Sequence, residues 1–244
     1  MALPFFYKED VDLTTKQVVL DEDTSKHMVQ VLRMKNGAQL QLTNGKGALF
    51  TCEITDDNRK KCAVSILTIT NYQLSTINIA IAISLIKNNT RFEWFLEKAT
   101  EIGVTEIIPL ICEITEKTTF KLERMKGILV SAMLQSQQTW LPVLHEPIKF
   151  AALIKQSNQQ QKFIAHCIDE NDKERLSAKL INSRNERDVP HLTSKLILIG
   201  PEGDFTKEEI EIALRNTFIP VALGATRLRT ETAGIVAATL LVQL

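Results

Sequence analysis

Two glycine-bearing loops near the C-terminus carry the residue types best suited to holding a small ligand. The first, Gly200-Pro201-Glu202-Gly203, follows the apolar run 195–199, and the second begins at Leu223-Gly224 after a shorter apolar run. Glycine lets a ligand approach backbone N–H and C=O groups closely, and in open α/β sheets ligands bind beyond the carboxyl ends of strands. Strand-to-helix turns also use Gly and Pro for purely structural reasons, and either loop taken alone favours that simpler interpretation.

Three charged side chains follow in the second loop, where it enters a helix predicted to begin near Glu231. Glu231 is favourable at this position because the N-terminal end of a helix is partly positive. Arg227 and Arg229 are unfavourable at the same end, which indicates that they await an anion or a carboxylate partner. We therefore favour a functional role for these arginines over a structural one.

Several kinds of site are excluded by what the sequence lacks. It contains neither G-x-x-x-x-G-K-[ST] nor G-x-G-x-x-G, which argues against a nucleotide triphosphatase or a dinucleotide-dependent enzyme. The four histidines are scattered, so no metal site is predicted. The four cysteines have no zinc-site spacing and are interpreted as buried free thiols: Cys52, Cys62, Cys112 and Cys167.

The elements that position the loops alternate between strands and helices from about residue 73 onward. Apolar runs predict strands at 77–86, 106–111, 162–168, 195–200 and 219–223, with periodic helical stretches between them. This order is typical of an α/β domain with a mainly parallel sheet. Pro109 indicates that the second of these strands lies at an edge or is broken.

The helix after the first loop has a specific start signal. Thr206 and Glu209 have the spacing of a capping box, in which each side chain bonds the other residue's amide. Phe205 and Ile210 occupy the positions of a hydrophobic staple. The turn between the first loop and its helix is thus predicted to be held on both sides.

The first seventy or so residues follow a different pattern of short strands and polar turns. Strands are predicted at 18–20, 39–43, 48–54 and 62–67, with a tight turn at Asn44-Gly45-Lys46-Gly47. Ser25 is predicted to cap a short helix through 27–33. This pattern predicts a small, mostly β barrel or sheet.

Composition and charge narrow the function. The chain has 244 residues, 44% of them hydrophobic, which is ample for a buried core. No apolar run approaches the roughly 20 residues of a membrane span, and the N-terminus lacks signal-peptide features, so we expect a cytoplasmic protein. The formal net charge is zero. A nucleic-acid contact must therefore come from a local basic patch.

Four sequence blocks occur in the order and spacing of one known family. The blocks are His27 with Val31-Leu32-Arg33, KATEIGV at 98–104, GPEGDF at 200–205, and Leu223-Gly224 with LRTETAG at 228–234. Together they resemble the ribosomal small-subunit RNA methyltransferase E family of the SPOUT superfamily. The resemblance extends over nearly the whole chain.

The resemblance implies a fold and an activity. It implies a PUA-like β-barrel RNA-binding domain at residues 1–72 and a SPOUT α/β domain with a trefoil knot at residues 73–244. It implies a homodimer that uses S-adenosylmethionine, releases S-adenosylhomocysteine and methylates N3 of a uridine in small-subunit (16S) ribosomal RNA. The RNA partner is either free RNA or the assembled 30S subunit, and neither a metal nor a membrane is implied.

The same resemblance implies where the cofactor lies. The residues expected to hold it are Leu198, Ile199, Gly200, Pro201, Glu202, Gly203, Leu223, Gly224, Leu228, Thr230, Thr232 and Ala233. The residues expected to contact RNA are His27, Arg33, Arg91 and Arg227.

We assign catalysis to Arg229 and Glu231. Arg229 is expected to donate to a uracil carbonyl oxygen as negative charge develops. Glu231 either accepts the N3 proton or orients Arg229. We prefer the second role, because an unperturbed Glu is a weak base for this proton.

One segment departs from the family pattern. The stretch 134–142 keeps Gln135-Ser136 and Pro142 but lacks the basic residues that many members carry there. If those basic residues contact RNA, this chain must use others, such as Lys87, Arg91 or Trp140. The Trp140 indole suits stacking on a base, but a core position is equally compatible with the sequence.

Three alternatives remain open at this stage. The chain could be a SPOUT enzyme that acts on a ribose 2′-hydroxyl or on transfer RNA. It could be a non-catalytic RNA-binding or ribosome-assembly protein, or a small-molecule enzyme on an ordinary doubly wound fold. Cofactor binding and the identity of the methylated atom distinguish these possibilities.

Overall fold

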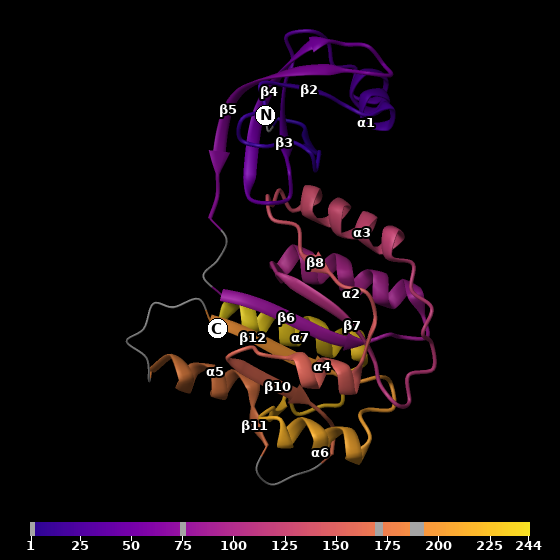
Figure 1. Ribbon diagram of the computed structural model, residues 1–244, viewed down its shortest axis with the longest axis vertical. Coiled ribbons are helices and arrows are strands. Elements are labelled where there is room, and N and C mark those ends of the chain that lie inside the picture. The colour runs from indigo at the N-terminus through magenta and orange to yellow at the C-terminus, as the bar shows by residue number, and fades with distance from the viewer. Residues whose placement is uncertain (1–2, 74–76, 169–172, 186–192) are drawn as a thin grey trace. The chain divides into compact units, whose positions relative to one another are not determined.

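The computed structural model describes residues 3–73, 77–168, 173–185 and 193–244 (Figure 1). The chain divides into two compact units. Unit 1 comprises Met1–Leu74 and Met133–Leu141, and unit 2 comprises Ser75–Ala132 and Pro142–Leu244. Each unit has its own sheet and its own buried core.

Unit 1 is built on a five-stranded mixed sheet in the order β1-β3-β4-β5-β2. Strands β1 and β3 are parallel and the other neighbours are antiparallel. The strand β4 alternates, burying Phe50, Cys52 and Ile54 in the core, because successive side chains of a strand point to opposite faces. The predicted β module is confirmed, with strands β1 (Phe5–Tyr7), β2 (Gln17–Val19), β3 (Gln39–Thr43), β4 (Ala48–Asp56) and β5 (Ala63–Asn71).

The tight turn between β3 and β4 is covered by the 139–141 segment of the same unit. Gly47 donates its amide to the Thr139 carbonyl at 2.9 Å, and the Leu141 amide donates to the Gly45 carbonyl at 2.9 Å. Gly47 has a φ of 92°, and an added Cβ would lie 2.4 Å from the Trp140 ring. Glycine is therefore required at position 47, and Trp140 is half-buried against this turn, which favours the core interpretation of its indole.

The first helix of unit 1 is capped by Asp21, so the prediction that Ser25 is the cap is wrong. The Asp21 carboxylate accepts the Thr24 amide at 2.9 Å at the start of α1 (Glu22–Lys26). Ser25 is buried inside the helix, and its hydroxyl accepts the Cys62 amide at 2.9 Å. Asp and Ser are both common helix caps. Only the tertiary contact of Ser25 with Cys62 shows that Asp21, and not Ser25, is the cap here.

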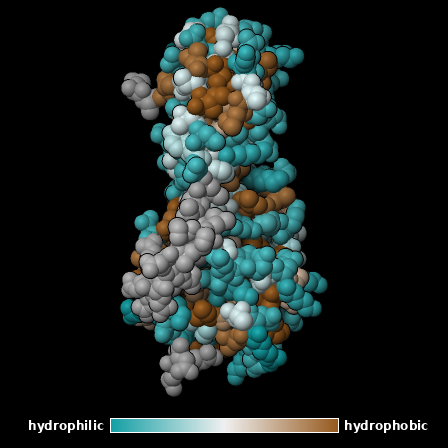
Figure 2. Space-filling view, turned by 60° about the vertical axis from the view of Figure 1, so that its left-hand side comes forward, coloured by the Kyte–Doolittle hydropathy of each residue, from teal (hydrophilic) through white to brown (hydrophobic). Residues whose placement is uncertain are grey.

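A wide helical turn, η1 (His27–Val31), follows α1 and ends in a surface loop. The Leu32 amide donates to the His27 carbonyl at 3.0 Å, and Arg33 has a φ of 54°. This geometry leaves Val31 65% exposed and Leu32 43% exposed. Hydrophobic surface is visible among the polar surface of unit 1 in Figure 2.

Unit 2 is built on an eight-stranded sheet whose described pairs are all parallel, as predicted. Its order is β11-β13-β10-β12-β6-β7-β8, and β9 also pairs with β7. Parallel order brings the carboxyl ends of the strands to one edge of the sheet. The strands are β6 (Ile77–Ser84), β7 (Glu106–Ile111), β8 (Val143–Leu144), β9 (Ile148–Lys149), β10 (Gln161–Ala165), β11 (Glu174–Arg175), β12 (Thr193–Ile199) and β13 (Ile219–Ala222).

The strand β7, which contains Pro109, has neighbours on both sides, so an edge position is wrong. It pairs with β6 on one side, and with β8 and β9 on the other. Strand β8 pairs with Glu106 and Ile107, whereas β9 pairs with Leu110 and Ile111. Pro109 falls between these two paired stretches, where a residue without an N–H is tolerated.

Helices cover both faces of this sheet (Figure 1). Ala80 and Ala82 of β6 belong to the cluster that packs α4 and α6. Ile83 lies on the opposite face, where Gly234 of α7 fits against it and against Phe95 of α2. An added Cβ at Gly234 would approach the Phe95 ring to 2.7 Å, so this glycine allows α7 to approach the sheet closely. The helices are α2 (Asn89–Ile102), α3 (Leu122–Gln135), α4 (Phe150–Gln156), α5 (Leu176–Asn185), α6 (Lys207–Arg215) and α7 (Thr230–Gln243).

None of the helices in the described parts of the chain has the length and apolar character that a membrane crossing requires.

The capping box at the start of α6 is confirmed and extends further than predicted. The Thr206 hydroxyl accepts the Glu209 amide at 3.2 Å, and Glu209 Oε2 accepts the Thr206 amide at 3.0 Å. Glu209 Oε1 also accepts the amide of Glu113, in the loop after β7, at 2.9 Å. The buried Glu209 carboxylate therefore hydrogen-bonds two loops to each other at the carboxyl edge of the sheet.

Glu209→Ala is expected to lower the melting temperature by about 5–10 °C. A hydrogen bond to a charged group contributes roughly 1.5–3 kcal/mol, and about 1 kcal/mol corresponds to roughly 2–4 °C for a unit of this size. Glu208 is exposed in the same helical turn, so Glu208→Ala is the matched control in thermal denaturation. Equal melting temperatures for the two variants would contradict a stabilising role for the Glu209 hydrogen bonds.

Candidate active site

The carboxyl ends of β10, β12 and β13 and the N-terminal end of α7 enclose two adjoining hollows. The first has a volume of about 350 Å³ and is lined by 199–202 and 227–231, among others. The second has a volume of about 380 Å³ and is lined by 221–228, among others. Both are in the size range of small-molecule sites. We call them together the cleft, because five residues line both: Ala165, Cys167, Arg227, Leu228 and Ala233.

The cleft brings together most of the residues expected to bind a cofactor. Nine of them line it: Ile199, Gly200, Pro201, Glu202, Leu223, Gly224, Leu228, Thr230 and Ala233. Leu198 lies instead in the core beneath, and Gly203 packs against Ile114. Thr232 does not line either hollow.

The expected catalytic and RNA-binding residues divide between the two units. Arg91, Arg227, Arg229 and Glu231 line the first hollow in unit 2. His27 and Arg33 are exposed in unit 1.

A hydrogen bond joins the end of β12 to the start of α7. The Thr230 hydroxyl donates to the Gly200 carbonyl at 3.0 Å, and Thr230 is buried. An added Cβ at Gly200 would lie 3.2 Å from the Phe205 amide nitrogen, so the loop folds back tightly at this glycine. The N-cap residue of α7, Arg229, makes no side-chain cap bond. The first amides of α7 therefore keep their capacity to bind negative charge.

Glu231 pairs with an arginine other than the one expected. Its Oε1 lies 3.6 Å from Nε of Arg91, on α2. Its Oε2 is buried and has no hydrogen-bond partner among the described residues. Arg229 is exposed and makes no ion pair within the described chain. The geometry therefore does not support the interpretation that Glu231 orients Arg229.

The loop that follows β10 also lines the cleft, which no motif in the sequence indicates. The predicted strand 162–168 ends at Ala165, and Ala165, His166 and Cys167 line the cleft. Asp204 also lines it, with its Oδ2 accepting the Cys167 amide at 2.6 Å. No glycine or charge marks 165–167 in the sequence. The sequence carries one indirect signal. The strand predicted at 162–168 belongs to the same parallel sheet as the strands before the two glycine loops, so the loop after it lies at the same edge of the sheet.

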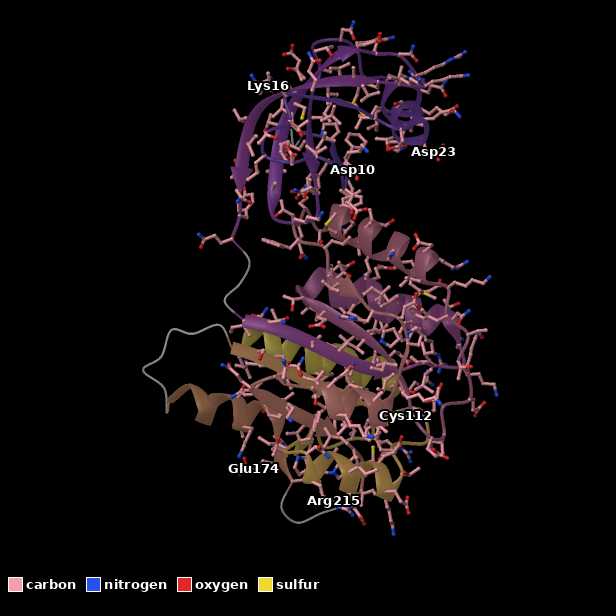
Figure 3. All side chains as sticks on the ribbon, viewed as in Figure 1. Asp10, Lys16, Asp23, Cys112, Glu174 and Arg215 are labelled. Carbon is pink, nitrogen blue, oxygen red and sulfur yellow. The ribbon has the colours of Figure 1, made fainter. Side chains whose placement is uncertain are left out.

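The cysteines differ from one another, and the prediction that all four are buried is wrong for Cys167. Cys52, Cys62 and Cys112 are buried, whereas Cys167 is exposed at the cleft. Figure 3 shows Cys112 among the side chains of unit 2. Burial raises the pKa of Cys52 to about 12. Burial also raises the pKa of Cys112, with a further contribution from the nearby Glu209 carboxylate, so both buried thiols stay protonated and unreactive.

Comparison with known proteins places the chain in a family. A family model for an RNA methyltransferase domain matches residues 73–242, and a model for an RNA methyltransferase PUA domain matches residues 20–67. The "Ribosomal RNA small subunit methyltransferase E" of Buchnera aphidicola subsp. Acyrthosiphon pisum is 30% identical in an alignment that covers 98% of this chain and 92% of that protein.

The chain belongs to the ribosomal RNA small subunit methyltransferase E family.

Solved structures with the fold of this methyltransferase E chain include two close matches. A probable rRNA-methyltransferase from Porphyromonas gingivalis has a TM-score of 0.85 and 38% identity, with 97% of this chain and 95% of that chain covered. A ribosomal RNA small subunit methyltransferase E from Neisseria gonorrhoeae, solved with S-adenosyl methionine, has a TM-score of 0.81 and 27% identity over 97% and 95% of the two chains. The resemblance in the sequence and the predicted fold class, a PUA-like β unit and an α/β unit, are confirmed.

Proposed function

We propose that the protein is an S-adenosylmethionine-dependent methyltransferase that methylates N3 of a uridine in small-subunit ribosomal RNA. The observation that carries the proposal is the cleft at the carboxyl edge of the sheet. Two glycine-bearing loops, three arginines and the buried carboxylate of Glu231 line this cleft. One oxygen of that carboxylate has no hydrogen-bond partner among the described residues. Membership of the methyltransferase E family supports the same conclusion.

The residues of the cleft fit this cofactor. S-adenosylmethionine carries an ammonium, a carboxylate, a sulfonium and an adenosine, so its site needs both signs of charge and accessible backbone groups. The cleft offers Glu202 and Asp204 beside Arg227, together with the backbone of two strand ends. We assign cofactor binding to the parts of the two loops that line the cleft, 199–202 and 223–224, and to Leu228, Thr230 and Ala233. When bound, the cofactor supplies an electrophilic methyl group.

The remaining chemistry concerns the uracil ring, and we assign it to Glu231 and Arg229. N3 of uridine is an imide N–H and is a poor nucleophile until it loses its proton. Glu231 Oε2 accepts that proton, because it is buried and has no hydrogen-bond partner in the part of the chain that the structure describes. The resulting negative charge spreads over O2 and O4, where the Arg229 guanidinium donates a hydrogen bond. Arg91 holds the other oxygen of Glu231.

The reaction is tested by mapping the methylated atom. The purified protein is incubated with S-adenosylmethionine and small-subunit RNA, either free or in assembled subunits. An N3 methyl group blocks the base-pairing edge of uracil, so reverse transcription is expected to stop at the modified uridine. A methyl group on a ribose 2′-hydroxyl, identified by mass spectrometry of the nucleosides, would overturn the proposed chemistry.

Replacing His27 and Arg33 together, as His27→Ala with Arg33→Asn, is expected to weaken RNA binding on the order of tenfold or more at moderate salt. Both side chains are exposed beside the hydrophobic Val31 and Leu32, and loss of a phosphate contact weakens binding and lowers its salt dependence. Asn is chosen for position 33 because it tolerates the positive φ.

The control for this RNA-binding test is Arg59→Ala, which removes another exposed basic side chain of unit 1. RNA affinity is measured by filter binding over a range of salt concentrations, and affinity for S-adenosylhomocysteine is measured in parallel. Wild-type RNA affinity in the double variant would remove His27 and Arg33 from the RNA surface.

We further propose the roles of the two domains, the oligomeric state, the cellular location and the RNA partner of the enzyme. Residues 1–72 act as the RNA-binding domain and residues 73–244 as the methyltransferase domain, with a trefoil knot. The protein works as a homodimer in the cytoplasm, with the assembled 30S subunit or its free RNA as partner. Light scattering of the purified protein tests the dimer, since a monomeric mass at micromolar concentration would contradict it.

A further inference from the structure

The segment 166–168, which follows β10, is held from two directions. Its central amide, Cys167 N–H, donates to Oδ2 of Asp204 at 2.6 Å. The carbonyls on either side, those of His166 and Ile168, accept from Nζ of Lys173 at 2.8 and 2.7 Å. Two oppositely charged side chains thus bind backbone groups of three successive residues. We call Asp204 and Lys173 the clamp.

The backbone and the side chain of Asp204 are themselves fixed by hydrogen bonds. It has a φ of 73°, and its amide donates to the Pro201 carbonyl at 2.9 Å, closing the first glycine loop. Its Oδ1 accepts the amide of Phe205 at 2.9 Å. Both carboxylate oxygens are therefore used, one within the loop and one across to Cys167. Positive φ is unfavourable for a residue with a side chain, so these bonds offset a real backbone cost.

The clamp lies where it controls the shape of the cleft. Strands β10 and β12 are neighbours in the sheet, with Ala165 opposite Ile199, and the loops that leave them form facing walls. Cys167 lines both hollows, Asp204 lines the first and Lys173 the second. Without Asp204, the 166–168 segment would lose the bond that joins it to the first glycine loop. Without Lys173, the segment would lose the bonds that fix its own backbone.

We propose that Asp204 and Lys173 are positioning residues that preform the cofactor cleft. Asp204 holds segment 166–168 against the first glycine loop, and Lys173 fixes the backbone of that segment. The inference rests on the proposed function of the cleft and adds two residues to it. Neither residue is assigned a contact with the reacting atoms. A preformed site avoids the cost of ordering its loops when the ligand binds, so the clamp contributes to cofactor affinity.

The decisive variants are Asp204→Gly and Lys173→Met. Glycine accepts the positive φ but removes both carboxylate acceptors, which separates the bonds from the strain. Methionine keeps a long unbranched side chain and removes the ammonium donors. Calorimetric titration with S-adenosylhomocysteine is expected to show a dissociation constant raised on the order of tenfold in each, because hydrogen bonds to charged groups are lost. Asp204→Asn, which keeps one acceptor oxygen, is expected to lie between wild type and Asp204→Gly.

A control variant and a kinetic readout separate positioning from general damage. Thr217 also has a positive φ, 66°, and is exposed away from the cleft lining, so Thr217→Gly is expected to bind the cofactor product like wild type. With saturating S-adenosylmethionine, the clamp variants are expected to regain most of the wild-type kcat, while KM for the cofactor rises. A loss of kcat with unchanged KM would overturn the positioning role.

Cys167 provides a second readout within the cleft. It is the exposed thiol, whereas Cys52, Cys62 and Cys112 are buried, so alkylation by iodoacetamide at mildly alkaline pH reports on segment 166–168. Saturation with S-adenosylhomocysteine is expected to slow alkylation of Cys167 in the wild type. Asp204→Gly and Lys173→Met are expected to speed it several-fold in the absence of the ligand, because the segment is released.

The outcomes distinguish the clamp from the function on which it rests. Wild-type affinity and a wild-type Cys167 alkylation rate in both folded variants would overturn the clamp alone. Absence of any binding of S-adenosylhomocysteine to the wild-type protein would overturn the proposed function instead. If Asp204→Gly does not fold, as judged by circular dichroism, Lys173→Met and Asp204→Asn decide the question by the same two measurements.

Discussion

Arg229→Ala is expected to lower kcat by about 10²–10³-fold while leaving the affinity for S-adenosylhomocysteine within a few-fold of wild type. Removing one preorganised donor to a developing oxyanion typically has an effect of this size. Arg229 lines the first hollow and is not engaged in an ion pair within the described chain. Its guanidinium is therefore available to the uracil oxygen on which charge develops.

The arginine prediction is checked by single-turnover methylation of RNA with saturating cofactor. Arg215 is the matched control, since it is exposed on α6 and pairs with Glu211 at 2.7 Å, so Arg215→Ala is expected to retain full turnover. Arg229→Lys is expected to recover part of the rate, because the charge remains but the planar fork is lost. A folded Arg229→Ala protein with wild-type turnover would eliminate Arg229 from catalysis.

Glu231→Gln is expected to lower kcat by about 10²–10⁴-fold, the range for removal of a general base. Glutamine has nearly the same shape as glutamate and can fill the same buried position, but it cannot take up the N3 proton. The unpartnered Oε2 is the observation that motivates the prediction. Glu208→Gln, on an exposed residue of α6, is the control for an acidic-to-amide change.

A double-mutant cycle with Arg91 separates the possible roles of Glu231. Arg91 Nε lies 3.6 Å from Glu231 Oε1, and its side chain is 42% exposed, so the pair is partly screened and contributes little by itself. If Glu231 is the proton acceptor, Arg91→Ala lowers kcat far less than Glu231→Gln does. Equal losses in both single variants, with no further loss in the double variant, would show that Glu231 acts only through Arg91.

The local elements of the fold were predictable because their signals are local. The capping box of Thr206 and Glu209 needs only neighbouring residues, and it forms as expected. Strand β3 begins and ends at the predicted residues, since alternation and the Asn44–Gly47 turn both lie within a few positions of it. Gly103 ends α2 with a φ of 99°, the left-handed conformation that a glycine after the last turn of a helix favours.

Errors arose where two local interpretations were equally good. Asp21 and Ser25 are both suitable cap residues, and the contact with the Cys62 amide decides that Ser25 lies inside the helix. Pro109 is tolerated in an internal strand because β8 and β9, which pair with β7 on one side, leave a gap opposite it. The charged stretch 182–190 indicates a loop by its sequence, but α5 continues to Asn185, and the remainder of the stretch lies outside the described residues.

The sequence by itself determined the alternation of strands and helices, the two glycine loops and the motif blocks that identify the family. These features depend on residue type and on short spacings along the chain. Only the tertiary structure decided that Glu231 faces Arg91 and that Asp204 bonds Cys167. The partners in these pairs come from different elements of unit 2. Their meeting depends on which strands are neighbours in the sheet and which helices cover them, and no local pattern in the chain encodes that order.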